Sequence, residues 1–299
     1  MKLFDLHCDT ATAIYDNGAE LRDNKMAVDL KYADRYENYV QVYAIFINDN
    51  LRGKKAYDYY ENTLRYIKNQ FTKYNVKKYG TGARLQGIVS VEGGAAIAGN
   101  IDNLYKMYDH GVRILTFTWN GECELGYGHE KNKGLKPFGK DVAKKCLEIG
   151  VIPDVSHLSE KGFWDLCDEY SKPFIATHSN SKKVYKNTRN LTNKQLKEIF
   201  LRGGLCGINY YKGFLAGESS SVDDVYRHIY YMLNLGGQRS IALGSDFDGA
   251  DIPCGFDRLD KVSIIYEYLL SKNIEEDIVK DIFYNNAKQF FDIHLGELQ

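Results

Sequence analysis

The stretch FDLHCDT, residues 4–10, decides the fold that we predict for this chain. It is typical of a β-strand, and residues two apart in a strand project from the same face, so His7 and Asp9 point together while Cys8 points away. An imidazole and a carboxylate on one face can begin a metal site. A strand-end histidine beside a helix-capping aspartate would give the same letters, so the metal interpretation depends on further ligands elsewhere in the chain.

The overall composition is that of a soluble globular protein. The chain has 299 residues, 44% of them hydrophobic, which is enough for a substantial core. With 39 basic and 40 acidic side chains the net charge is −1, so a nucleic-acid or membrane-surface partner is not indicated. Six cysteines form no CxxC pair, and neither a signal peptide nor a transmembrane span is recognisable. We therefore expect a cytoplasmic protein.

Short apolar runs alternate with amphipathic segments along the whole chain. Including the first stretch, eight strands are predicted, at 4–10, 39–47, 84–94, 112–118, 151–157, 173–181, 203–211 and 240–249. Helices are predicted at 54–74, 103–110, 140–149, 193–202, 258–271 and 275–292, with two more after the caps Ser159 and Ser221. Eight such units predict a single α/β domain over residues 1–299, a (β/α)8 TIM barrel. An open doubly wound sheet is the alternative, but no GxGxxG follows the first strand.

Candidate metal ligands stand where these predicted strands end. They are His7, Asp9, Glu92, His157, His178 and Asp246. The carboxyl ends of the strands of a barrel form one rim, so side chains that are far apart in the sequence would meet there. Imidazole and carboxylate ligands without thiolate suit Zn²⁺, and do not exclude Mn²⁺, Co²⁺ or Fe²⁺. Six groups exceed the needs of one tetrahedral zinc, so the sequence predicts two ions that share one carboxylate and a hydroxide.

The motifs around these residues resemble those of the membrane (renal) dipeptidase family of zinc dipeptidases, a branch of the amidohydrolase-type barrels. The resemblance is carried by HCD at 7–9, VEGG at 91–94, DVSH at 154–157, THSN at 177–180, TRN at 188–190 and GSDFDG at 244–249. It implies that His7 and Asp9 hold one zinc and that His157 and His178 hold the second. Glu92 would bridge the two ions.

The resemblance also implies roles in substrate binding and catalysis. Asp246 would be the proton shuttle near the bridging hydroxide. Arg189, which taken alone is well explained as a solvated loop arginine, would clamp the α-carboxylate of a dipeptide. Mammalian members carry a histidine where this chain has Trp119, and that histidine steadies the substrate carbonyl. An indole cannot become a cation, so either the metals alone stabilise the oxyanion or Asn120 or His129 takes over.

Other polar residues receive simpler interpretations. Tyr210 and Tyr211 end the seventh strand and would line the substrate pocket, unless they only pack at the rim. The loop 119–137, which carries His129, is long enough to be a lid. We expect His110, His228 and His294 to lie at the surface. Asp5 and Asp154 would be carboxylates that support the ligand histidines from behind. Asp248 and Asp251 would shape the loop after Asp246.

These observations predict a metallo-dipeptidase with two zinc ions per chain, or Mn²⁺ or Co²⁺ in their place. Its substrate would be a small dipeptide, and the resemblance implies tolerance of a D-residue on the carboxyl side and a homodimer. No nucleic-acid or membrane partner is expected. The alternatives are another amidohydrolase activity, on N-acyl-D-amino acids, lactams or lactones, and a non-catalytic metal-bound scaffold that binds peptides.

Overall fold

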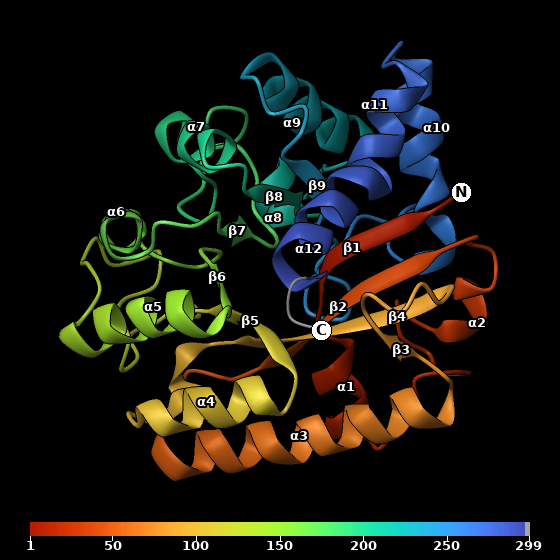
Figure 1. Cartoon of the computed structure of the whole chain (residues 1–299). Helices are drawn as coiled ribbons and strands as arrows, with labels where there is room; N and C mark the ends of the chain where they lie inside the picture. The colour runs from red at the N-terminus through yellow and green to blue at the C-terminus, as the bar shows by residue number, and fades with distance from the viewer. Residues whose placement is uncertain (297–299) are drawn as a thin grey trace.

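The computed structural model describes residues 1–296 and contains a closed barrel of eight parallel strands (Figure 1). The barrel strands are β1 (Leu3–Cys8), β2 (Tyr39–Phe46), β4 (Leu85–Glu92), β5 (Val112–Thr116), β6 (Ile152–Asp154), β7 (Ile175–Ala176), β8 (Leu205–Ile208) and β9 (Ile241–Leu243). Each strand pairs with the next, β9 pairs with β1, and β2 pairs with both β1 and β4, which closes the ring. The predicted (β/α)8 barrel is confirmed.

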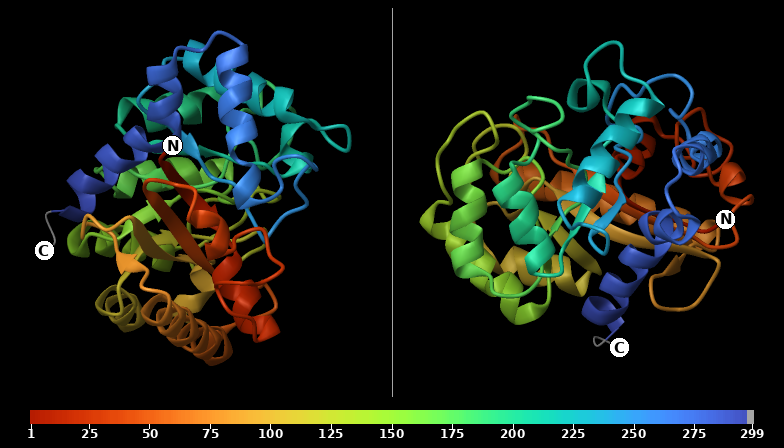
Figure 2. Two further views of the ribbon diagram at one scale, coloured as in Figure 1. Left: turned by 90° about the vertical axis from the view of Figure 1, so that its right-hand side faces the viewer. Right: turned by 90° about the horizontal axis from the view of Figure 1, so that it is seen from above.

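Helices follow the strands and surround the barrel (Figures 1 and 2). The longer ones are α1 (Thr10–Asn17), α3 (Gly53–Lys73), α4 (Ile101–Asp109), α5 (Pro137–Ile149), α6 (Glu160–Glu169), α7 (Asn193–Leu201), α9 (Val222–Asn234), α10 (Ser263–Ser271) and α12 (Asn286–Gly296). Short elements are α2 (Leu30–Ala33), β3 (Lys77–Lys78), η1 (Gly94–Ile97), α8 (Lys212–Leu215), η2 (Leu259–Lys261), α11 (Glu276–Lys280) and η3 (Asp281–Asn285). The helix predicted at 275–292 is thus split into α11, a π-helical turn and α12.

Three helix starts follow from local side-chain hydrogen bonds. Thr192 and Gln195 form a reciprocal capping box at α7, and Ser221 and Asp224 do so at α9. Ser159 caps α6 by accepting a hydrogen bond from the backbone N–H of Gly162. All three caps were recognisable in the sequence.

Two apolar clusters fill the molecule. The inner cluster takes residues from every barrel strand, for example Phe4, Val42 and Ile114, and ends against Phe290 and Phe291 of α12. Figure 1 looks onto the end of the barrel that α12 crosses. The outer, larger cluster lies between the strands and the surrounding helices. One end of the barrel is therefore plugged, which leaves the carboxyl ends of the strands as the accessible mouth.

The strands end earlier than predicted. His157, His178 and Asp246 therefore lie in the loops that follow β6, β7 and β9, whereas His7 and Glu92 lie within β1 and β4. On β1, a register irregularity between Asp5 and Cys8 breaks the alternation. Cys8 accordingly packs in the outer cluster, although the regular period of two would place it with Phe4 inside. His157 and Asp246 follow β6 and β9 with positive φ angles of 67° and 64°. Such left-handed backbone is uncommon outside glycine and recurs at functional sites, because the surrounding structure must hold it in place.

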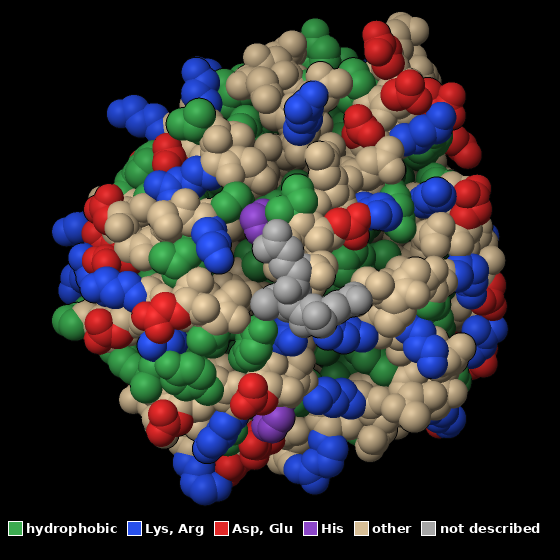
Figure 3. Space-filling view, in the orientation of Figure 1, with side chains coloured by type: hydrophobic (Ala, Val, Ile, Leu, Met, Phe, Trp, Pro, Cys, Tyr) green, Lys and Arg blue, Asp and Glu red, His purple; other side chains and the backbone are tan. Residues whose placement is uncertain are grey.

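The face of the molecule seen in Figure 3 carries charges of both signs, as the balanced net charge of the chain would suggest. On the face seen in Figure 3, Lys and Arg side chains are interspersed with Asp and Glu. Among residues 1–296, no helix has the length and apolar character needed to cross a bilayer.

Candidate metal centre

The predicted ligands converge at the open mouth of the barrel. Three overlapping groups of side chains have donor atoms within 4.8 Å of one another. These groups are His7, Asp9 and Glu92; Glu92, His157 and His178; and His7, His178 and Asp246. Five of the six residues are at least 92% buried, and Asp246 is 9% exposed. The six residues that the sequence predicts as one cluster therefore lie together.

Glu92, at the end of β4, stands between two sets of ligands. Its Oε2 lies 3.7 Å from Nε2 of His7. Its Oε1 lies 2.9 Å from Nε2 of His157 and 3.3 Å from Nε2 of His178. Asp9 joins the first set, because its Oδ2 is 3.4 Å from Nε2 of His7 and its buried Oδ1 has no hydrogen-bond partner within residues 1–296. The two oxygens of one carboxylate thus face two different donor groups, which is the arrangement of a bridging ligand.

Hydrogen bonds behind His178 fix its tautomer. The Asp154 carboxylate accepts from the Thr177 hydroxyl at 2.7 Å and from the Thr116 hydroxyl at 2.6 Å. Since the Thr177 hydroxyl donates its proton to Asp154, it must accept from Nδ1 of His178, which lies 2.8 Å away. His178 therefore carries its proton on Nδ1 and presents the Nε2 lone pair to Glu92. Asp154 is the supporting carboxylate that we expected, and Thr177 is a link that the sequence reasoning missed.

Asn120 does the same for His157. The Asn120 Oδ1 lies 2.8 Å from Nδ1 of His157, so this nitrogen donates and Nε2 is left as an acceptor. Asn120, predicted to bind substrate, lies at the cavity and also orients a ligand histidine.

The donor set fits divalent cations. Both Nε2 atoms of His157 and His178 carry lone pairs, and they face each other at 2.9 Å with Oε1 of Glu92 beside them. Two lone pairs and a carboxylate oxygen repel one another at this distance unless a positive charge lies between them. Imidazole and carboxylate donors with fixed partners on the far side are typical of zinc sites.

The electrostatics of the buried cluster point the same way. Burial lowers the pKa of His157 and of His178, and the nearby charges of His7 and Arg189 lower both further, so both imidazoles are neutral at neutral pH. Burial also opposes protonation of His7, but the carboxylates led by Glu92 raise its pKa to about 10. Burial raises the pKa of Glu92.

Asp246 lies beside the first ligand set with one oxygen held. Its Oδ2 accepts a hydrogen bond of 2.9 Å from the Asn209 side chain, and its Oδ1 is 3.8 Å from Nε2 of His7. Burial raises the pKa of this carboxyl group. The side chain lines the cavity over the predicted metal ligands.

Arg189 lies next to the cluster but below its surface. Arg189 is 3% exposed, and its guanidinium donates to Ser179 Oγ at 3.3 Å and to the carbonyl of His178 at 3.2 Å. Its Nε has no hydrogen-bond partner among the described residues. Its guanidinium carbon is 5.2 Å from the ring of Phe214, which lines the cavity. Burial lowers the pKa of Arg189 to about 10, which still leaves it charged at neutral pH. It is not a solvated loop residue.

A cavity of about 560 Å³ opens above the metal ligands, within the usual size of small-molecule sites. Its walls are partly aromatic: Phe46, Trp119, Tyr211 and Phe214. Trp119 packs edge-on against Phe46 with ring centroids 4.8 Å apart. The expectation that Tyr210 lines this cavity is wrong. Tyr210 is fully buried between Phe247 and Phe256, and its neighbour Tyr211 is the tyrosine at the wall.

Two further expectations can be checked against the contacts. Asp248 shapes a loop as expected, because it accepts from the Thr10 hydroxyl and from the backbone N–H groups of Ala27 and Val28. The surface position expected for His228 is wrong. That side chain, on α9, is fully buried and links the N–H of Ser181 to the carbonyl of Leu215.

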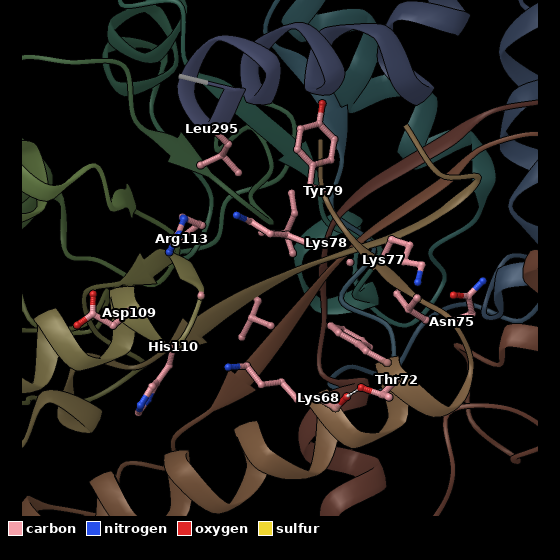
Figure 4. A pocket seen from close by; sticks show the side chains of 16 residues that line it. Lys68, Thr72, Asn75, Lys77, Lys78, Tyr79, Asp109, His110, Arg113 and Leu295 are labelled. Carbon is pink, nitrogen blue, oxygen red and sulfur yellow. Dashed lines mark hydrogen bonds between the residues drawn. The ribbon is translucent and has the colours of Figure 1, made fainter. Parts of the chain in front are cut away.

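A second cavity, of about 590 Å³, lies away from the cluster (Figure 4). It opens at the amino-terminal half of β4, at residues 87–89, whereas Glu92 ends that strand. Lys68, Lys78 and Arg113 are among the side chains around it. It shares no residue with the three ligand groups, so we assign the chemistry to the first cavity.

A closed (β/α)8 barrel with imidazole and carboxylate donors around a shared glutamate defines the class of metal-dependent hydrolases of the amidohydrolase type. The sequence pattern of the membrane dipeptidase family, peptidase family M19, matches residues 1–293. The chain belongs to this family of metallo-dipeptidases, as its motifs predicted.

Relatives of known sequence are similar over part of their length. An uncharacterized protein from the pqqA 5′ region of Klebsiella pneumoniae is 34% identical over 179 residues, which are 56% of this chain and 66% of that protein. An uncharacterized dipeptidase of Schizosaccharomyces pombe is 30% identical over 213 residues, which are 68% of this chain and 52% of that protein. The matches thus span between about half and two thirds of these relatives.

Solved structures share the fold over nearly the whole chain. The dipeptidase AC, a metallopeptidase of family M19, has a TM-score of 0.92 at 23% identity, with 98% of both chains covered. A metallopeptidase from Rhodobacter sphaeroides, liganded with a phosphinate mimic of the dipeptide L-Ala-D-Ala, has a TM-score of 0.91 at 22% identity. That comparison covers 98% of this chain and 99% of the other. At these identities the likeness establishes the fold.

Proposed function

We propose that this protein hydrolyses the peptide bond of small dipeptides and that it does so with two divalent cations, zinc being the best match to the ligands. The observation that carries the proposal is the position of Glu92, whose two oxygens face separate donor groups. His7 and Asp9 would hold one ion, and His157 and His178 the other. Mn²⁺ or Co²⁺ suits the same donors.

When bound, the cations polarise the scissile carbonyl and acidify a water molecule. The protein supplies the proton transfers. Asp246 Oδ1 accepts the proton of the attacking water, while the bond from Asn209 keeps Oδ2 in place. The hydroxyl adds to the carbonyl carbon, the C–N bond breaks, and Asp246 returns the proton to the leaving amine.

Arg189 supplies the preference for a free carboxylate in this proposal. A buried guanidinium with an unpaired Nε is a strong partner for a substrate anion, because little water competes for it. The aromatic walls of the cavity would hold the apolar parts of the dipeptide. Since the related Rhodobacter protein holds a mimic of L-Ala-D-Ala, we include L-Xaa-D-Xaa dipeptides among the proposed substrates.

The test is a hydrolysis screen with metal-loaded protein. The panel contains L,L and L,D dipeptides, each with a free and an amidated carboxyl terminus, together with N-acyl-D-amino acids and a lactone. We expect hydrolysis of free dipeptides above all other compounds. Preferred turnover of the N-acyl-D-amino acids or the lactone would identify the alternative amidohydrolase activity, and binding without turnover of any compound would identify the scaffold.

The Arg189→Ala variant tests the clamp. We expect KM to rise for free dipeptides, because the ground state and the transition state both carry the α-carboxylate, and to change little for amidated ones. Equal losses on free and amidated dipeptides would contradict the clamp.

Three expectations from the sequence stay predictions. They are that the chain acts as one catalytic domain, that it forms a homodimer and that it is located in the cytoplasm.

A further inference from the structure

His129 occupies an unexpected place behind the metal ligands. Its side chain is half-buried, and both of its ring nitrogens have partners. Nε2 lies 3.1 Å from Oδ1 of Asn120, the same oxygen that orients His157. Nδ1 lies 2.8 Å from the hydroxyl of Thr188, the residue before Arg189. One side chain thus connects the metal-ligand side of the site with the loop that carries the proposed clamp.

The protons in this network can be assigned from one end to the other. If His157 binds metal through Nε2, its Nδ1 must donate to Asn120 Oδ1. That oxygen has a second lone pair, so Nε2 of His129 can donate to it as well. A neutral His129 then leaves Nδ1 as an acceptor for the Thr188 hydroxyl. Each group has a compatible partner in this arrangement.

The local backbone is built for this contact. Gly128 lies so close to the chain at Asn120 that a Cβ on it would stand 2.0 Å from the Asn120 carbonyl oxygen. Its N–H donates to the carbonyl of Gly121 at 2.7 Å. The loop therefore folds back on itself, and this places the next residue, His129, against the Asn120 side chain. Burial, with a smaller effect of Arg189, lowers the pKa of His129 to about 4, which agrees with the neutral form.

We propose that His129 is a positioning residue that holds Asn120, and through it the ligand His157, in the metal-binding orientation, and that it anchors the Arg189 loop through Thr188. It does not itself touch substrate in this role. The inference rests on the proposed metal site. It assigns to the loop 119–137 a function in metal affinity, in addition to any function as a lid.

The two nitrogens of His129 can be tested separately. Glutamine places an amide group near the position of Nε2, and asparagine places one near the position of Nδ1. His129→Gln should therefore keep the contact with Asn120, and His129→Asn should keep the contact with Thr188. His129→Ala removes both. His110→Ala is the matched control, because His110 is also half-buried but lies at the end of α4, outside the network.

The first readout is zinc affinity, measured without substrate by competition with a chromophoric chelator. We expect His129→Ala to bind zinc about tenfold more weakly, which is the lower end of the usual effect of losing a group that supports a metal ligand. Zinc affinity should recover in His129→Gln but not in His129→Asn. Asn120→Ala should weaken binding more, and adding His129→Ala to it should cause little further loss. Wild-type affinity in His129→Ala, or a glutamine variant no better than alanine, would overturn the inference.

The second readout is KM for free and amidated dipeptides at saturating zinc. His129→Ala should raise KM for the free dipeptide, and His129→Asn should restore it. An unchanged KM in His129→Ala would overturn the anchoring of the Arg189 loop. Zinc affinity is measured without substrate, so the two proposals can fail separately. If the variants show the expected order of zinc affinities but the protein hydrolyses no dipeptide, the proposed function is refuted and the His129 network stands.

Discussion

The link between Asp154 and His178 allows a sharp prediction about zinc binding. Thr177→Val removes the hydroxyl that accepts from Nδ1 of His178, while the backbone N–H of residue 177 keeps its 2.9 Å bond to Asp154. Without metal, His178 can move its proton to Nε2 and avoid the loss. With metal bound at Nε2, the Nδ1–H stays buried and unpaired.

An unpaired buried donor costs about 1–3 kcal/mol. Since 1.4 kcal/mol corresponds to about tenfold in affinity, zinc binding should weaken by about 5- to 140-fold. Thr116→Val is the control, because Thr116 donates to the same Asp154 oxygen at 2.6 Å and its hydroxyl makes no hydrogen bond to a ligand histidine within residues 1–296. Both variants lose one hydrogen bond to a buried carboxylate, so both should lower the thermal stability of the metal-free protein by similar amounts.

The assay is chelator competition for zinc at fixed pH, with the melting temperature of each metal-free variant as a measure of folding. We expect Thr177→Val to bind zinc at least fivefold more weakly than Thr116→Val. Affinities within twofold of each other would refute the reasoning, because the loss would then come from Asp154 and not from the orientation of His178.

Three further predictions follow from the site. Asp246→Asn should retain zinc but lower kcat by about 10²–10⁴, the usual effect of losing a positioned acid or base, and zinc loss in this variant would instead mark Asp246 as a ligand. The metal-free protein should lose stability as the pH rises from about 6.5 to about 10. His7 binds its proton more tightly in the folded state than in the unfolded state. Its contribution to folding stability is therefore complete below its unfolded pKa and disappears above its folded pKa. A rise in the free energy of unfolding over this pH range, measured in urea, would contradict the prediction. Gly128→Ala should reduce zinc affinity and stability together, because its Cβ would collide with the Asn120 backbone, and unchanged values of both would show that the loop can relax.

Much of the fold could be predicted because it is encoded locally. Short apolar runs that alternate with segments of helical periodicity identify the barrel. Capping side chains that lie three residues apart, such as Thr192 and Gln195, mark where a helix starts. The strand ends were less predictable. His157 and Asp246 look like continuations of strands, but their backbones turn left-handed in loops that long-range contacts hold.

The candidate site shows a similar division between its ligands and their supports. The ligand residues could be found because barrel topology alone brings strand ends to one rim. Their supports depend on contacts between loops. Tyr210 and Tyr211 are neighbours in the sequence, and only the packing of the mouth decides that Tyr211 faces the cavity while Tyr210 is buried.

The sequence by itself determined the barrel and the six groups at its mouth, because the periodicity of the strands and the residue types at their ends are local properties of the chain. Only the tertiary structure decided which nitrogen of His157 and of His178 faces the candidate metal site. That choice depends on hydrogen bonds to Thr177 and Asn120. It also decided that His129 stands behind Asn120, since the path of a loop is fixed by distant residues that it contacts and not by its own composition.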